Sequence, residues 1–398
     1  MKYVIVIPDG CADEPQAALG GQTPLRAART PHMDRLAQLG MVGRSNNVPA
    51  TLTPASDVAT LSLFGYDPLR YYTGRAPLEA AALGIALGPH DWAVRCNLVT
   101  VEQGAMGDFT AGHISSAEGR QLIESLQQAL GTNTLTFHPG VSYRNLLILR
   151  RGEPGPFSSA TRTQAPHDIP DRPIADYLPS GPGSELLREL MDRSQAVLAG
   201  HQVNQARRSK GQRPATQIWL WGQGQAPSLT PFKELYGPRG AIITGVDLVR
   251  GVGALLGWQV LNVPGVTDYL DNDYRAQGQA AVEALAEFDL VCVHVEAPDE
   301  ASHEGRLDAK MQALEAIDEH IVGPLLQALE RAGQFRILVS PDHPTPVRTR
   351  SHAHGLVPWV LAGTGITASG AEHYDEAHAA AGPVYDPGWK LMSKFLKP

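Results

Sequence analysis

The sequence predicts an α/β fold, in which a mostly parallel sheet is flanked by helices and a smaller α+β domain is inserted into the chain. Three observations predict this class. An amphipathic helical pattern lies between two of the predicted strands, and a polar region rich in Pro, Gly and Ser interrupts the series. Four short apolar stretches, each closed by Pro, Gly or Asp, are typical of parallel strands buried on both faces: 3–8, 290–296, 337–340 and 357–363.

The helical pattern follows the second of these strands and precedes the third. Its apolar residues recur at three- and four-residue spacing: Leu307, Met311, Leu314, Ile317, Ile321 and Leu325. The pair Gly323-Pro324 is expected to kink or break the helix, because proline removes a helical hydrogen bond. Strand, helix and strand in this order predict a βαβ unit with a right-handed crossover.

The middle of the chain has a different character. Its strand-like stretches AVRCNLVTV and YRNLLIL are separated by polar loops. We infer one domain from residues 1–72 and 217–398, and an inserted domain from residues 73–216. The chain is expected to return to the first domain near residues 209–219.

Composition excludes several classes of function. The 398 residues carry a net charge of −8 without a basic cluster, which argues against a nucleic-acid partner. No apolar run is long enough to span a membrane, and the apolar start is too short for a signal peptide. Cys11, Cys96 and Cys292 are typical of reduced core thiols. The sequence thus predicts a cytoplasmic protein without a membrane partner, and it gives no indication of an oligomeric state.

Three of the predicted strands end at, or just before, an aspartate. Asp9 follows the first strand, Asp299 the second and Asp342 the third. The carboxyl ends of parallel strands share one edge of a sheet, which is where ligands bind. Three carboxylates there would raise one another's pKa unless positive charge lay between them.

Histidines accompany these aspartates. His303 lies four residues after Asp299, His343 follows Asp342, and His352 and His354 precede the last strand. Carboxylate and imidazole ligands without thiolate suit Mn²⁺, Zn²⁺ or Mg²⁺, and their number suits a two-metal cluster. A strand-end aspartate by itself is usually a cap or turn residue. The coincidence of three such elements favours the metal site.

Ser56 is the hydroxyl that such a cluster would activate. It follows a Pro-rich turn and begins a helical pattern, where N–H groups favour a phosphate. Metal coordination would convert it into a nucleophile. A serine in this place is also a favoured helix N-cap, and Thr53 and Ser62 are alternative hydroxyls.

At this point the motifs resemble those of cofactor-independent phosphoglycerate mutases, in the shorter, archaeal-type branch of the alkaline phosphatase superfamily. The resemblance covers nearly the whole chain. Its two most specific motifs are PASDVATLSLFGYDP (54–68) and VEAPDEASH (295–303). The other motifs, in order of position, are PDG (8–10), TGRAPLEAAALGI (73–85), VRCNLVTV (94–101), DFTAGHISS (108–116), SPDHPTPV (340–347) and SHAHGLVPW (351–359).

The resemblance implies an alkaline-phosphatase-like domain with two divalent metal ions, Mn²⁺ first and Zn²⁺ or Mg²⁺ as variants. It implies that the inserted domain binds a phosphorylated glycerate. His352 stands at the family's distance from the closing VP strand, and His354 remains the alternative. The implied ligands are Asp9, Ser56, Asp342 and His343 for one metal, and Asp299, His303 and His352 for the other.

The resemblance also implies roles in the inserted domain. Asp168, in APHDIP, takes the place of the acid that accepts a glycerate hydroxyl proton, and His167 stands where the longer branch has arginine. Arg95, His113 and Arg144 are further candidates for anion contacts.

The implied function is interconversion of 3-phosphoglycerate and 2-phosphoglycerate through a phosphoserine. The alternative is a metal-dependent phosphatase, or another phosphotransferase such as a homoserine kinase, on the same scaffold. No GxxxxGK[ST] phosphate loop occurs in the sequence.

Overall fold

The structure is a computed structural model that describes residues 1–150 and 155–397, and the chain divides into two compact units. The first unit comprises residues 1–72 and 229–398, and the second comprises residues 73–228. The chain therefore leaves the second unit after residue 228, and the expected boundary at 216/217 is wrong. The reason is that β7 (Gln217–Gln225) pairs with β3 (Trp92–Glu102) inside the second unit. An apolar strand does not carry in its own sequence the identity of the sheet that it joins.

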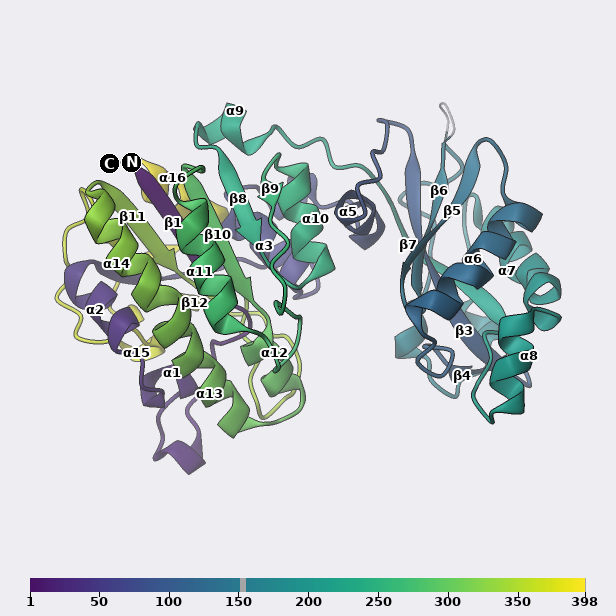
Figure 1. The fold of residues 1–398 in the computed structure, drawn as a ribbon, viewed down its shortest axis with the longest axis horizontal. Coiled ribbons are helices and arrows are strands. Elements are labelled where there is room, and N and C mark those ends of the chain that lie inside the picture. The colour runs from purple at the N-terminus through teal and green to yellow at the C-terminus, as the bar shows by residue number, and fades with distance from the viewer. Residues whose placement is uncertain (151–154, 398) are drawn as a thin grey trace. The chain divides into compact units, whose positions relative to one another are not determined.

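The first unit is built on one sheet with the strand order β13-β2-β12-β11-β1-β10-β8-β9. Figure 1 labels the strands β12, β11, β1, β10, β8 and β9 of this sheet. The central strands β11, β1, β10 and β8 are parallel. The expected parallel strand at 357–363 is antiparallel to β11, so that part of the prediction is wrong. A strand buried on both faces has the same apolar composition in either direction. The bounds are β1 Lys2–Pro8, β2 Met41–Ser45, β8 Gly240–Ile243, β9 Gln259–Val260, β10 Leu290–Val295, β11 Phe335–Val339, β12 Val357–Gly363 and β13 Val384–Tyr385.

Helices cover both faces of this sheet, as the sequence predicts. Val4 and Val6 of β1 face a core with α2, α11, α13 and α14, whereas Tyr3 on the other face contacts Phe395 of α16. The alternation follows from the two-residue period of a strand. The helices of this unit are α1 Pro24–Ala27, α2 Pro31–Leu39, α3 Ser56–Leu63, α4 Pro68–Tyr71, α9 Phe232–Tyr236, α10 Asp247–Leu255, α11 Tyr274–Ala284, α12 Ala297–His303, α13 Leu307–Ile317, α14 Gly323–Ala332, α15 Glu376–Ala379 and α16 Leu391–Leu396.

The expected helix between β10 and β11 forms, but Gly323-Pro324 does not break it. A π-helical turn, Asp318–Val322, joins α13 to α14, and both Val322 and Gly323 keep right-handed helical dihedral angles. Proline is tolerated there because it stands in the first turn of α14, and the wider π turn before it accommodates the missing N–H.

Lys310 of α13 forms hydrogen bonds to both of the loops that follow β1 and β11. Its side chain is fully buried, and its Nζ donates to the carbonyl oxygens of Gly10 and Thr345, each at 3.0 Å. It also forms an ion pair of 2.9 Å with the buried carboxylate of Asp13. Both loops carry candidate site residues, so this ammonium group fixes the distance between them.

We expect Lys310→Met to destabilise the protein by about 3–5 kcal/mol, because it leaves the Asp13 carboxylate buried without its cation. The measurement is the free energy of unfolding in denaturant. The control is Arg348→Met, which removes an exposed ion pair with Glu14 on the same loop and should leave stability unchanged. Equal effects of the two substitutions would contradict the role of Lys310.

The second unit is a smaller α+β unit. Its sheet has the order β4-β3-β6-β5, and β7 also pairs with β3. Helices α6 and α7 pack on this sheet around a separate apolar core. Its remaining elements are α5 Arg75–Ala82, β4 Ala105–Asp108, α6 Ser116–Leu130, β5 Leu135–Val141, β6 Arg144–Leu149, α7 Ser184–Ala199 and α8 Gln202–Ser209.

Two further expectations concern the chain as a whole. In residues 1–150 and 155–397, none of the helices combines the length and the apolar character needed to cross a bilayer. Cys11, Cys96 and Cys292 are all buried and unpaired, as expected for core thiols.

Candidate metal centre

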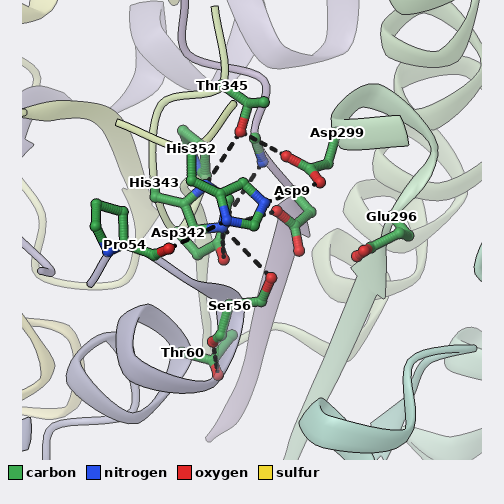
Figure 2. Close-up of polar contacts among 12 residues, drawn as sticks. Asp9, Pro54, Ser56, Thr60, Glu296, Asp299, Asp342, His343, Thr345 and His352 are labelled. Carbon is green, nitrogen blue, oxygen red and sulfur yellow. Dashed lines mark hydrogen bonds and ion pairs between the residues drawn. The ribbon is translucent and has the colours of Figure 1, made fainter. Parts of the chain in front are cut away.

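The three aspartates predicted from the strand ends lie together at the carboxyl edge of the first unit's sheet (Figure 2). Asp9 directly follows β1, and Asp342 lies in the loop after β11. Asp299 lies not in a loop but in α12, which starts directly after β10. All three residues are at most 1% exposed. The parallel order of β11, β1 and β10 brings them together.

These aspartates form two overlapping groups with the histidines. Ligand atoms of Asp9, Asp342 and His343 lie within 4.8 Å of one another, and so do those of Asp299, His343 and His352. Nε2 of His303 lies 2.9 Å from Oδ2 of Asp299 and 3.0 Å from Nε2 of His352. The first group contains three of the four residues expected for one metal. The second shares Asp299 and His352 with those expected for the other metal, and has His343 where His303 was expected.

Three imidazoles are held with Nε2 directed into the cluster. Nδ1 of His303 lies 2.9 Å from the carbonyl oxygen of Arg350, and Nδ1 of His352 lies 3.1 Å from that of Pro54. A carbonyl oxygen can only accept, so each Nδ1 carries a proton, and in the neutral ring each Nε2 keeps a lone pair. Two neutral rings with Nε2 atoms 3.0 Å apart, beside a carboxylate, would repel one another, so protons or a cation must supply positive charge there.

Thr345 gives His343 the same orientation. Its hydroxyl donates to Oδ1 of Asp299 at 2.5 Å, so it can only accept from Nδ1 of His343 at 3.2 Å. Nε2 of His343 then faces Oδ2 of Asp342 at 3.3 Å and Oγ of Ser56 at 3.4 Å. The result is a third nitrogen with a free lone pair.

The geometry separates His352 from its alternative. Nε2 of His352 lies 3.3 Å from Oδ2 of Asp299. The exposed His354 instead has Nε2 2.9 Å from the carbonyl oxygen of Leu52, and that nitrogen must carry the proton. His352 therefore has the orientation of a ligand, and His354 does not.

Ser56 is the first residue of α3 and does not cap it. The N-cap is Ala55, and no side chain fills the capping role there, so the Ser56 hydroxyl is free to face His343. Of the alternative hydroxyls, Thr53 is exposed. Ser62 follows six residues later on α3 and so points about 120° away around the helix.

The charges of the cluster are out of balance without cations. Burial, reinforced by the charge of Asp9, raises the pKa of Asp342 to about 7. Burial also raises the pKa of Asp299, but hydrogen bonds from His303 and His352 outweigh it and hold that pKa well below its usual range. The hydrogen bond to Asp299 raises the pKa of His303 to about 9. The site thus attracts positive charge.

Unsatisfied atoms test whether metal ions fit here. Among the described residues, Oδ1 of Asp9, Oδ2 of Asp342 and Oε2 of Glu296 are buried without a hydrogen-bond partner. Cys11 is close by, but burial holds the pKa of its thiol well above the usual range, so it supplies no thiolate. Free carboxylate oxygens and imidazole nitrogens, without sulfur, are the ligands that Mn²⁺, Mg²⁺ and Zn²⁺ accept. The residues fit divalent metal ions.

Two residues of this site were missed by sequence reasoning. His294 is fully buried in β10 with Nε2 2.8 Å from Oδ2 of Asp9, and Glu296 directly follows the strand. Burial, followed by the charges of Asp9 and Asp299, raises the pKa of Glu296 well above its usual range. The available signal was a polar residue inside an otherwise apolar strand, LVCVHV.

The candidate residues of the second unit form a basic cluster in part. Arg95 is 6% exposed, pairs with Glu79 at 2.9 Å and lies over the ring of Trp221. Burial, and the charges of Arg75 and Arg144 among its neighbours, lower the pKa of Arg95. Arg75 was not among the predicted residues.

His167 and Asp168 stand beside this basic cluster. Burial lowers the pKa of His167, with Arg95 and Arg75 contributing, and its ring packs against Trp221. The side chain of Asp168 is 56% exposed and accepts a hydrogen bond of 2.9 Å from Gln164. His113 is exposed, on the turn after β4.

Comparisons with known proteins agree on one family. Residues 37–204 match the family model described as 2,3-bisphosphoglycerate-independent phosphoglycerate mutase. A protein of that name from Methanothrix thermoacetophila is 48% identical over 96% of each chain. A protein from Geobacter sulfurreducens, named as a probable enzyme of this kind, is 48% identical over the whole of both chains.

Two solved structures are similar to this chain over nearly its whole length. The PH0037 protein from Pyrococcus horikoshii is 28% identical with a TM-score of 0.82, over 99% of this chain and 97% of that one. The cofactor-independent phosphoglycerate mutase from Thermoplasma acidophilum is 26% identical with a TM-score of 0.70, over 100% and 99%.

Proposed function

The chain belongs to the 2,3-bisphosphoglycerate-independent phosphoglycerate mutase family, and we propose that Ser56 and the surrounding cluster carry out its phosphoryl transfer. The enzyme interconverts 3-phosphoglycerate and 2-phosphoglycerate, a step of glycolysis and gluconeogenesis. Its place in that pathway and its buried, unpaired cysteines support a cytoplasmic location. The observation that carries the proposal is the cluster of imidazoles whose Nε2 atoms face the buried aspartates, with that of His343 3.4 Å from Oγ of Ser56.

Two divalent cations, Mn²⁺ first and Zn²⁺ or Mg²⁺ as variants, suit the residues of this cluster. When bound, they favour the ionised form of the Ser56 hydroxyl and neutralise charge on the phosphoryl oxygens. One cation would be held by Asp9, Ser56, Asp342 and His343, and the other by Asp299, His303 and His352.

The reaction then needs only one nucleophile. Oγ of Ser56 forms a bond to phosphorus while the bond from phosphorus to the substrate's C3 oxygen breaks, and the proton of Ser56 ends on that oxygen. The C2 hydroxyl of the retained glycerate next attacks the phosphoserine. Asp168 accepts the proton of that hydroxyl, and the serine oxygen leaves phosphorus and is protonated again, which completes an isomerisation without net hydrolysis.

The second unit supplies charge that suits the glycerate. Arg75, Arg95 and Arg144 form a basic cluster beside His167, and this cluster favours a carboxylate or phosphate. Asp168, largely exposed beside His167, can accept a proton. We assign these residues, together with the exposed His113, to substrate binding.

The test is phosphorus NMR of 3-phosphoglycerate incubated with the purified protein and Mn²⁺. We expect 2-phosphoglycerate to accumulate to equilibrium without inorganic phosphate, and we expect no conversion by EDTA-treated protein. Release of inorganic phosphate would instead identify a phosphatase. ATP-dependent phosphorylation of homoserine, without mutase activity, would identify a kinase. Either result would overturn the proposal.

A further inference from the structure

A row of hydrogen-bonded side chains crosses three adjacent strands beneath the metal centre. Asp9 follows β1, His294 lies in β10, and Thr244 follows β8, and these strands are neighbours in the sheet. Nε2 of His294 lies 2.8 Å from Oδ2 of Asp9, and its Nδ1 lies 3.1 Å from Oγ1 of Thr244. The three side chains are at most 2% exposed. No water or solvent ion is needed to connect them.

The protons in this row have a defined direction. The carboxylate of Asp9 can only accept, so Nε2 of His294 carries the imidazole proton and donates it to that carboxylate. Nδ1 of the neutral ring therefore accepts from the hydroxyl of Thr244, whose oxygen also accepts the backbone N–H of Val246 at 3.1 Å. The reverse arrangement would place a lone pair of His294 against a carboxylate oxygen at 2.8 Å.

This orientation is opposite to that of the three histidines in the cluster. The Nδ1 protons of His303 and His352 face carbonyl oxygens, so only the neutral rings with an unprotonated Nε2 can bind a cation. His294 presents Nε2–H instead. It is therefore built to hold a carboxylate, not to bind a cation.

The backbone of His294 is fixed as well. Its carbonyl oxygen accepts a hydrogen bond of 2.8 Å from Nε2 of the fully buried Gln277. Oε1 of Gln277 in turn accepts one of 2.9 Å from Asn272. The imidazole therefore has little freedom to leave Asp9.

We propose that His294 is a positioning residue that fixes the carboxylate of Asp9, with Oδ2 held and Oδ1 free for a cation, and that Thr244 sets its tautomer. Oδ1 of Asp9 is the atom that lacks a hydrogen-bond partner. This inference rests on the proposed function, because it takes Asp9 as a metal ligand. Partners that hydrogen-bond a metal ligand typically change metal affinity about 10–100-fold when they are replaced.

The experiment measures Mn²⁺ binding to EDTA-treated, dialysed full-length protein by electron paramagnetic resonance. For His294→Leu we expect the dissociation constant of one of the two ions to rise about 10–100-fold. His294→Gln, whose amide can donate to Asp9 from nearly the same place, should stay within about threefold of the wild type. Thr244→Val should fall between them, and Thr244→Ser should match the wild type.

Cys292→Ala is the matched packing control. Cys292 is buried two residues earlier on β10, on the same face as His294. The Cys292→Ala variant should bind Mn²⁺ as tightly as the wild type. Melting temperatures in EDTA are measured for all variants, because a purely structural role of His294 would lower them without changing Mn²⁺ affinity. Should His294→Leu fail to fold, the Gln and Thr244 variants carry the test.

The outcomes separate the two proposals. If the wild type binds no Mn²⁺, the proposed metal centre itself fails. If the wild type binds two ions and His294→Leu binds them equally tightly, only the role of His294 fails. Loss of one whole ion in His294→Gln, with the other affinities unchanged, would make His294 a ligand together with Asp9 and Glu296, and would also overturn the inference.

Discussion

Ser56→Ala is expected to lower kcat for the conversion of 3-phosphoglycerate by at least about 10⁴-fold, because it removes the only nucleophile in the proposed reaction. The phosphoryl group then has no acceptor, and binding and charge stabilisation alone leave a small residual rate. The hydroxyl contacts the His343 side chain at 3.4 Å, a distance too long for a strong hydrogen bond, so the fold should be unaffected. Substrate labelled in the phosphoryl group should leave acid-stable label on the wild type and none on the variant.

The alternative hydroxyls serve as controls for Ser56. Thr53→Ala changes an exposed residue of the preceding turn, and Ser62→Ala changes a buried residue on another face of α3. Both variants should keep kcat within a few-fold of the wild type and should still take up label. If Ser56→Ala kept more than a hundredth of the activity, or if label persisted on it, the nucleophile would have to be sought elsewhere.

The strand-end aspartates could be predicted from sequence because two simple rules coincide there. A buried parallel strand has a recognisable apolar composition, and parallel strands present their carboxyl ends at a common edge. These two rules alone are enough to place Asp9, Asp299 and Asp342 together. His303 and His343 could be predicted because they lie close in sequence to Asp299 and Asp342. His352 was preferred to His354 only through the family resemblance.

Other features depend on contacts that are distant in sequence. The direction of β12 and the sheet to which β7 belongs are decided by pairing partners, and the apolar composition of these strands is the same for either choice. In the sequence, His294 stands at a buried strand position like those of the other residues of β10, and nothing about that position indicates its partners. Its role depends on Thr244, fifty residues away, which fixes its tautomer. Sequence patterns thus supply the candidate ligands, whereas the groups that orient them emerge only from the fold.

The metal centre also predicts that Asp342 lowers the stability of the metal-free protein although it is needed for metal binding. This carboxyl group is fully buried, and its Oδ2 has no hydrogen-bond partner. In the metal-free protein, burial and the charge of Asp9 raise its pKa to about 7, against about 3.9 in an unfolded chain. Because the folded state binds the proton more tightly, Asp342 lowers stability progressively as the pH rises from about 4 to 7. Above pH 7 the destabilisation is complete.

We therefore expect Asp342→Asn to be more stable than the wild type in EDTA at pH 8, by a few kcal/mol on the order-of-magnitude scale of such a pKa difference. At pH 5 most of this gain should vanish, since the wild-type carboxyl group is then largely protonated. The amide oxygen of asparagine can still accept the hydrogen bond of 3.2 Å from the backbone N–H of Gly10. The measurement is the free energy of unfolding in denaturant at both values of pH.

Saturating Mn²⁺ should reverse this order. A ligand that binds only the folded state stabilises it by roughly 4 kcal/mol at a thousand times its dissociation constant, and the variant lacks one of the ligands that produce this gain. Its activity should fall by more than about 100-fold, beyond the usual effect of losing a group that merely orients a ligand. Asp308→Asn, at a side chain that is 68% exposed, should change neither stability nor activity. Two results together would contradict this account: an Asp342→Asn variant less stable than the wild type in EDTA at pH 8, and equal stabilisation of both proteins by Mn²⁺. The crowded carboxylates would then carry no repulsion for a metal to relieve, and the cluster would not be held together by cations.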